Sequence, residues 1–95
     1  MVFSATRLSR VPDGNRWRYT YRVTDVDETG SYFSTASSHI DYIIGAMPEE
    51  LATQFVCRAN SQTVGGVMGS APGDIAIQVV SGTVATDFVL TFVGR

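Results

Sequence analysis

The sequence predicts an all-β protein, a small antiparallel β-sandwich or barrel of about six to seven strands, with at most one short helical turn near Pro48. Residues 15–26, NRWRYTYRVTDV, alternate between apolar and polar side chains with a period of two. Side chains of an extended strand point alternately to opposite faces, so this pattern is typical of a strand with one buried face. Short apolar runs separated by turn residues elsewhere in the chain favour further strands.

The strand predicted over residues 15–26 is the centre of this interpretation. Its apolar face comprises Trp17, Tyr19, Tyr21 and Val23, and its polar face comprises Arg16, Arg18, Thr20, Arg22 and Thr24. A first strand is expected over residues 2–11, and the VPDGN segment at residues 11–15 supplies the proline, aspartate and glycine of a tight turn. The two strands are therefore expected to form an antiparallel hairpin.

The middle of the chain contains turns and a second amphipathic run. Residues 25–31, DVDETGS, are expected to form a solvated turn, because the spacing of their three carboxylates does not match a calcium-binding loop. Residues 31–38 are either an edge strand or an ordered loop. In the following strand we expect Ile40, Tyr42 and Ile44 to share the buried face and Gly45 to end the strand.

Residues 47–60 fit two interpretations. Pro48 followed by two glutamates resembles the first turn of a helix. The alternation and the β-branched and aromatic residues further on favour a strand over residues 51–59, with Phe55 and Cys57 on one face. We therefore expect a turn or one helical turn at residues 48–50, followed by that strand.

The last third of the chain combines a long loop with two strands. Residues 60–74 are rich in glycine and are expected to form a loop with a short strand at residues 63–68. The next strand carries Ile75, Ile77 and Val79 on one face, and Ser81-Gly82 forms a hairpin connection. The final strand carries Val84, Phe88, Leu90 and Phe92 on its apolar face. Val89 and Val93 on its other face indicate that this strand is covered on both sides, centrally or by a neighbouring subunit.

Length and composition indicate one domain covering residues 1–95. The formal net charge is −2, which does not favour nucleic-acid binding. All seven basic residues are arginine, which excludes mechanisms that need a lysine amine. Cys57 is the only cysteine, and no apolar run has the length of a signal peptide or a membrane span, so we expect a protein made and kept in a cytoplasm without membrane association.

No segment carries a motif specific to catalysis, to a cofactor or to a metal. His39 and Asp41 share a strand face after Ser37, but a polar strand face explains them better than a catalytic triad. Cys57 is expected to be a buried, inert thiol. The glycine-rich loop lacks the lysine of a phosphate-binding loop. We predict no catalytic, cofactor-binding or metal-binding residue, and a protein that is not an enzyme.

Two interpretations of the arginines at positions 16, 18 and 22 stay open. They form either a solvated face with carboxylate partners on neighbouring strands or a docking surface for a protein partner. The long glycine-rich loop is a further candidate for partner contact. The predicted partner-binding residues are Trp17, Arg18, Arg22, Val64, Gly65, Gly66, Val67 and Met68.

Three segments resemble the small virion structural proteins of tailed bacteriophages. They are RWRYTYRVTD at residues 16–25, SHIDYII at residues 38–44, and VVSGTVATDFVLTFVGR at residues 79–95, with a short segment containing Asn60 between them. The resemblance implies a β-sandwich or small barrel that decorates or cements the outer capsid surface. It further implies contact with the major capsid protein and with itself, often as a trimer, on virions assembled in a host cytoplasm, and no cofactor.

Two other functions remain as alternatives. The chain is also compatible with a neck or tail adaptor or a fibre-associated virion module. A small ligand-binding β-barrel protein or enzyme is the alternative from a different class.

Overall fold

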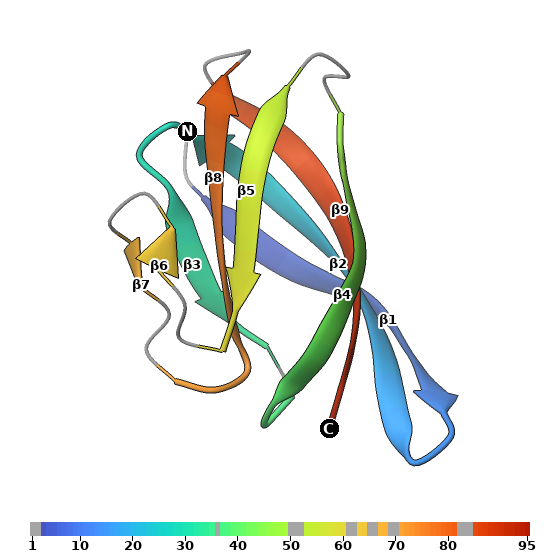
Figure 1. Cartoon of the computed structure of the whole chain (residues 1–95). Coiled ribbons are helices and arrows are strands. Elements are labelled where there is room, and N and C mark those ends of the chain that lie inside the picture. The colour runs from blue at the N-terminus through green and yellow to red at the C-terminus, as the bar shows by residue number, and fades with distance from the viewer. Residues whose placement is uncertain are drawn as a thin grey trace.

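The computed structural model describes residues 3–35, 37–49, 53–60, 63–64, 67–68, 71–81 and 85–95. Within these residues the chain forms a four-stranded and a three-stranded antiparallel sheet, and it has no helix. The two sheets pack on each other as the layers of a sandwich (Figure 1). The predicted all-β sandwich is confirmed.

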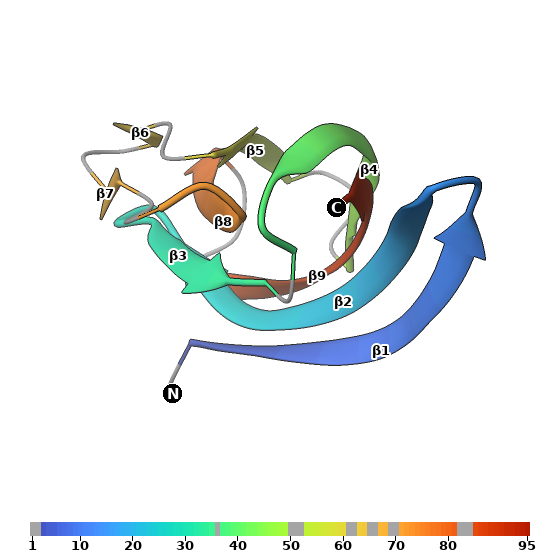
Figure 2. The same cartoon turned by 90° about the horizontal axis from the view of Figure 1, so that it is seen from below.

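The four-stranded sheet has the order β1-β2-β9-β4, and the three-stranded sheet has the order β3-β8-β5. The strands of the first are β1 (Ser4–Asp13), β2 (Arg16–Asp27), β9 (Ala85–Gly94) and β4 (Ile40–Pro48). Those of the second are β3 (Ser31–Ser34), β8 (Asp74–Ser81) and β5 (Gln54–Ala59). Figure 2 shows β1, β2 and β9 as one curved layer, with β3, β8 and β5 facing it.

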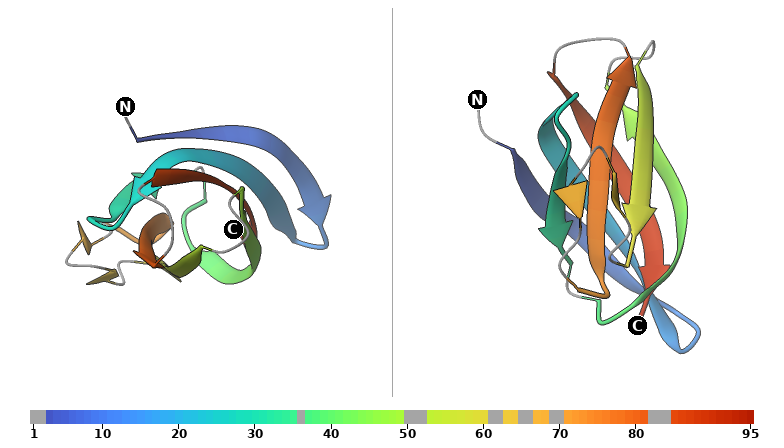
Figure 3. Two further views of the ribbon diagram at one scale, coloured as in Figure 1. Left: turned by 90° about the horizontal axis from the view of Figure 1, so that it is seen from above. Right: turned by 60° about the vertical axis from the view of Figure 1, so that its left-hand side comes forward.

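The predicted hairpin is formed by β1 and β2. Asp13 pairs with Arg16, and the turn between them contains Gly14 at a φ of 67°, a conformation that glycine adopts without steric cost. The turn end of the hairpin projects past the three-stranded sheet (Figure 3). Almost every residue of β1 is therefore exposed.

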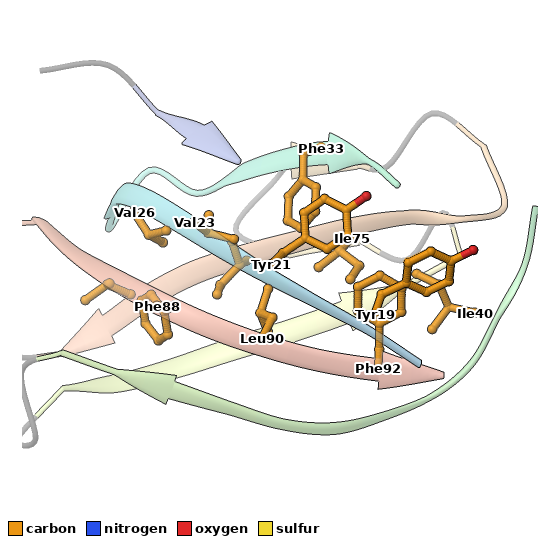
Figure 4. Close-up of a cluster of buried hydrophobic side chains, with 12 residues drawn as sticks. Tyr19, Tyr21, Val23, Val26, Phe33, Ile40, Ile75, Phe88, Leu90 and Phe92 are labelled. Carbon is orange, nitrogen blue, oxygen red and sulfur yellow. The ribbon is translucent and has the colours of Figure 1, made fainter. Parts of the chain in front are cut away.

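The core lies between the two sheets, and most of its residues belong to faces that the alternation predicts. Its members are Tyr19, Tyr21, Val23, Val26, Phe33, Ile40, Ile75, Ile77, Val79, Phe88, Leu90 and Phe92. In Figure 4 the ring of Phe92 lies beside those of Tyr19 and Tyr21, and the centroid distances are 5.2 and 5.6 Å. Aromatic pairs at this spacing add to the stabilisation that burial provides.

A β-bulge interrupts the alternation in β2. Tyr19, Tyr21 and Val23 point into the core, but the next buried residue is Val26, three positions later. Asp25 has a φ of 58°, and its backbone N–H donates to the Asp87 carboxylate at 3.2 Å. The strand therefore continues to Asp27, beyond the residue at which we expected the turn to begin.

The predicted faces of β4 are wrong. Ile40 is buried, but Tyr42 and Ile44 are exposed, and Ile43 packs against the core instead. Two register shifts, one between Ile40 and Tyr42 and one between Ile43 and Gly45, each add a residue to β4 relative to β9. Each added residue reverses the facing of those after it. The strand also continues through Gly45.

The expected turn at Pro48 is wrong as well, since Pro48 is the last residue of β4 and pairs with Phe88. A proline is tolerated there because β4 is an edge strand. The rest of the predicted turn and the start of the following strand, residues 50–52, lie outside the described residues. Phe55 and Cys57 of β5 pack against the core, as the alternation predicts.

The predicted long loop connects β5 to β8 and contains two short strands, β6 (Thr63–Val64) and β7 (Val67–Met68), which form a ribbon. Its last turn is built around Gly73, which has a φ of 93° and lies against the backbone of Ser37. The segment at residues 31–38 is an edge strand, β3, followed by a loop in which the Ser37 hydroxyl lies within hydrogen-bond distance of the carbonyls of His39 and Arg95.

The last strand, β9, is central in its sheet, because it pairs with β2 on one edge and with β4 on the other. Its inward residues, including Phe88, Leu90 and Phe92, are fully buried. On its outward face Val93 is buried and Val89 remains exposed. The hairpin connection predicted at Ser81-Gly82 is wrong, because Ser81 is the last residue of β8 and β8 belongs to the other sheet from β9. Gly82 and Val84, which was predicted on the apolar face of the last strand, lie outside the described residues.

Candidate functional site

The outer face of the four-stranded sheet, which points away from the three-stranded sheet, carries a group of exposed apolar side chains. Among the described residues, eight large apolar side chains are exposed, and four of them lie here on β4 and β9: Tyr42, Ile44, Met47 and Val89. We name these four residues the apolar strip. Met47 is 70% exposed, Tyr42 56% and Ile44 53%. Scattered single apolar residues are ordinary on a protein surface, but adjacent ones indicate an interaction site.

Pairing between strands brings the strip and the arginines of β2 into shared rows. Arg22 is opposite Val89, which is opposite Met47. Two positions further along, Thr20, Thr91 and Gly45 form the next row, and Arg18, Val93 and Tyr42 form the one after. Residues paired across a ladder point to the same face, so Arg18 and Arg22 lie on the same face as the strip.

Two hollows occupy this face and meet at Met47 and Val89. One of about 390 Å³ is lined by Arg22, Met47, Pro48, Glu49, Asp87, Phe88 and Val89. The other, of about 510 Å³, is lined by Arg18, Ile44, Gly45, Ala46, Met47, Val89 and Thr91. Gly45 contributes to the depth of the second, because no atom lies within 4 Å of the position that a Cβ would take. We name these two hollows together the outer groove.

Each arginine of the predicted basic stripe has a carboxylate partner on another strand of the same sheet. Arg22 donates to Asp87 at 2.9 Å, and Arg18 lies 3.6 Å from Asp13. Arg16 forms an ion pair with Asp41. This is the arrangement expected of a solvated face with carboxylate partners. Exposed pairs of this kind contribute little to stability, so they leave the arginines able to exchange partners.

The structure brings together only part of the predicted partner-binding set. Arg18 and Arg22 line the outer groove. Trp17 points to the other face of β2, packs partly against the core, and is covered by the Arg10 guanidinium, whose carbon lies 4.2 Å from the ring centroid. Val64, Val67 and Met68 belong to the β6–β7 ribbon beside the three-stranded sheet, and Gly65 and Gly66 lie outside the described residues.

The strip itself was not predicted. An unbroken alternation through β4 predicts Tyr42 and Ile44 on the buried face. The bulges that turn them outward depend on the register against β9, which a strand's own sequence does not reveal. The available signal was Val89, an apolar residue on the polar face of the last strand.

Asp41 is the centre of a charged cluster at one end of the same sheet. Its carboxylate accepts a hydrogen bond from Arg16 and lies 3.4 Å from Arg95 and 3.6 Å from the Nδ1 of His39. Burial by itself would raise the pKa of Asp41, but the Arg16 hydrogen bond and the charges of Arg16, Arg95 and His39 outweigh it and lower the pKa. Beside this cluster, the Ser37 hydroxyl lies within hydrogen-bond distance of the backbone carbonyls of His39 and Arg95. These contacts hold the loop before β4 against the end of β9.

Cys57 lies on β5 and packs against the core. Burial raises the pKa of its thiol to about 12, and the opposing effect of the neighbouring Arg58 is smaller. A thiol with so high a pKa has little of the thiolate form that reacts as a nucleophile. The side chain is only partly buried, which is less than predicted, and its raised pKa agrees with the predicted inertness of the thiol.

The acidic turn after β2 is organised by its own hydrogen bonds. The Asp27 carboxylate accepts a hydrogen bond from the backbone N–H of Thr29 at 3.0 Å. The Asp27 backbone carbonyl accepts one from the N–H of Gly30 at 3.3 Å. Within the described part of the chain, no three His, Cys, Asp or Glu side chains lie close enough to hold a metal ion. No helix among the described residues is long and apolar enough to cross a membrane.

Comparisons of the chain with protein-family models, curated proteins and solved structures return no significant match.

Proposed function

We propose that the chain is a non-enzymatic virion structural protein of a tailed bacteriophage, a decoration or cement protein that binds the assembled capsid shell and associates with copies of itself. The observation that carries this proposal is the apolar strip on a β-sandwich. Four large apolar side chains of β4 and β9, of which Met47 is the most exposed, lie on one sheet face. Water in contact with such a face is displaced when a partner covers it, and this favours association.

The composition of the outer groove supports a protein partner. Arg18 and Arg22 stand beside Ile44, Met47 and Val89 in its two hollows. Exposed methionine and arginine around an apolar centre are enriched at protein interfaces. The resemblance described above adds the identity of the larger partner, the major capsid protein. A protein that binds the assembled shell but not its free subunits stabilises the shell by mass action.

Electron microscopy of virus particles labelled with an antibody against the chain tests this proposal directly. We expect hundreds of copies distributed over the head. A single ring of copies at the neck or tail would instead support the adaptor or fibre-associated module. Absence of the chain from purified particles would contradict both.

A binding assay measures the effect on the shell. Particles that lack the chain are incubated with the purified protein, and their heat resistance is compared before and after addition. We expect bound particles to release their contents at a higher temperature. Unchanged heat resistance at saturating occupancy would show that the chain does not cement the shell.

A further inference from the structure

The charges at the two ends of the outer groove differ in sign. At one end Arg22 stands with two carboxylates, Asp87 and Glu49. At the other end Arg18 is the only charged side chain among the described residues that line the groove. Met47 and Val89 lie between the ends and belong to both hollows. Glu49 is exposed, and no ion pair involving it is found among the described residues.

We propose that the outer groove binds a second copy of the same chain across a two-fold axis, with Met47 of each copy against the apolar strip of the other. This inference rests on the proposed function in taking the outer face as an interaction surface. In a two-fold contact the same patch serves both copies, and a two-fold axis that crosses the groove at right angles inverts one groove relative to the other. Inversion places the Arg18 end of each groove at the Glu49 end of its partner.

Charge complementarity is the reason for choosing a second copy. A groove whose ends carry opposite net charge complements its own inverted image, so each copy supplies the carboxylate that the other copy's arginine lacks at the groove. Complementary charges of this kind fix the register of an interface and exclude other arrangements. Arg18 remains able to form these contacts, because within the described part of the chain its one ion pair is the exposed pair with Asp13 at 3.6 Å.

The strand edges of the four-stranded sheet are unsuited to association, which leaves its face. The free edge of β1 carries Arg7, Arg10 and Pro12, and its register shifts between Arg7 and Ser9. The free edge of β4 carries two register shifts and ends at Pro48. Charges, prolines and bulges on edge strands are features that prevent sheets from pairing edge to edge.

The size of the molecule agrees with face-to-face contact. Its two longer dimensions are 38 and 24 Å. These dimensions of the whole molecule set an upper limit for one face that is of the same order as the roughly 800 Å² that each partner contributes to a standard interface.

Sedimentation velocity or light scattering on the purified chain tests the contact without any particle. We expect a dimer whose population rises with protein concentration. Met47→Glu is expected to weaken dimerisation by at least about tenfold, because it places a carboxylate at the centre of the contact. Met47 is exposed, so the variant is expected to fold, and circular dichroism verifies this.

Val80→Glu is the matched control. Val80 is 51% exposed and lies on β8 of the other sheet, so the same change in charge and polarity occurs away from the groove. We expect this variant to dimerise like the unmodified chain. Equal loss of dimer in both variants would overturn the proposal.

Charge reversal tests the inverted geometry. Arg18→Glu and Glu49→Arg each place like charges at both ends of a homodimer, so each is expected to weaken association alone. Mixing the two variants restores opposite charges at both ends, and a heterodimer is expected. A mixture that stays monomeric, or an unmodified chain that is a monomer or a trimer, would overturn the two-fold contact. A monomer that still decorates particles would refute the self-association and leave the binding to the shell intact, whereas a dimer that does not bind particles would refute the binding to the shell alone.

Discussion

The side chain of Asn60 forms hydrogen bonds with both the N–H and the carbonyl of Ile40. The Asn60 side-chain oxygen accepts the N–H of Ile40 at 2.9 Å, and its amide nitrogen donates to the Ile40 carbonyl at 2.6 Å. Because Asn60 follows β5 and Ile40 begins β4, this pair ties the end of one sheet to the edge of the other. The same oxygen accepts the N–H of Gly73 at 3.1 Å. Asn60 has a φ of 61°, which asparagine tolerates better than most residues.

Replacing Asn60 with alanine is expected to lower the free energy of unfolding by about 2–4 kcal/mol, because partly buried backbone groups lose their partners. Urea denaturation measures the loss. Asn60→Gly is the control, since glycine accommodates the positive φ but makes none of the side-chain hydrogen bonds. If Asn60→Gly were as stable as the unmodified chain, the side-chain bonds would contribute nothing.

Gly73→Ala is expected to be among the most damaging exchanges of a glycine. A Cβ at this position would lie 2.1 Å from the carbonyl oxygen of Ser37, and the φ of 93° is unfavourable for alanine. We expect a loss of more than about 3 kcal/mol or failure to fold, since the obstructing atom belongs to the backbone.

Thermal unfolding of variants at two other glycines separates the cost of the steric contact from the cost of the positive φ. Gly14→Ala, in open space at a φ of 67°, imposes the conformational cost alone, which is about 1 kcal/mol. Gly45→Ala has neither obstruction nor a positive φ and is expected to leave the melting temperature unchanged or to raise it. Equal effects at all three positions would contradict the contact between Gly73 and Ser37.

Phe92→Ala is expected to cost about 3–5 kcal/mol, because Phe92 is fully buried and stacks with Tyr19. A small domain has a total stability of about 5–15 kcal/mol, so this single exchange would remove a large part of it. Val89→Ala on the same strand is the comparison, and we expect less than about 1 kcal/mol there because Val89 is exposed. Chemical denaturation of dilute protein measures both. Similar losses of stability in the two variants would contradict the placement of Phe92 in the core.

Cys57 is expected to lower the free energy of unfolding as the pH rises into the alkaline range. Its pKa rises from 9.0 to about 12 on folding. The folded state therefore favours the protonated thiol, and this contribution is complete below pH 9 and is lost as the pH rises toward 12. At pH 10 the loss is roughly 1 kcal/mol.

Unfolding of Cys57→Ala at pH 7 and pH 10 isolates this effect from other groups that titrate in the same range. We expect the variant to lose less stability than the unmodified chain between the two pH values. Reaction with a thiol reagent at pH 8 gives a second measure, since the thiolate fraction is about a thousandfold smaller at a pKa of 12 than at 9. Rapid labelling of the folded protein would show that the thiol is not protected.

Asp41 is expected to produce acid sensitivity. Its pKa is lowered from the ordinary value of 3.8 in the folded state, so its contribution to stability is present above pH 3.8 and is lost as the pH falls through the lowered value. Asp41→Asn lacks this titration. Its stability is expected to vary less with pH below 4 than that of the unmodified chain, as acid denaturation followed by fluorescence will show. Identical acid profiles would mean that the cluster around Asp41 is open to solvent.

Much of the fold could be predicted because burial follows simple alternation in three strands. Tyr19, Tyr21 and Val23 on β2, and Ile75, Ile77 and Val79 on β8, face the core as their spacing indicates. Phe88, Leu90 and Phe92 do the same on β9. These strands are central or paired along most of their length, so the division between apolar and polar faces is clear in the sequence itself.

The candidate site could be predicted only in part, because it depends on irregular pairing. Arg18 and Arg22 were found, since they follow the alternation of β2. Ile44 and Tyr42 were placed on the wrong face, because two bulges in β4 arise from its register against β9. The ion pair between Arg22 and Asp87 joins residues 65 positions apart, and no local pattern indicates such a partner.

The central position of β9 has a consequence for biosynthesis. β2 and β4 are joined in their sheet only through β9, so a ribosome-bound chain that ends before residue 85 has no partner to place between them. The hairpin of β1 and β2 can form early, because it needs no later residue. The completed sandwich must wait for translation of the final ten-residue strand, and until then the inward faces of β2 and β4 are surfaces that a chaperone can bind.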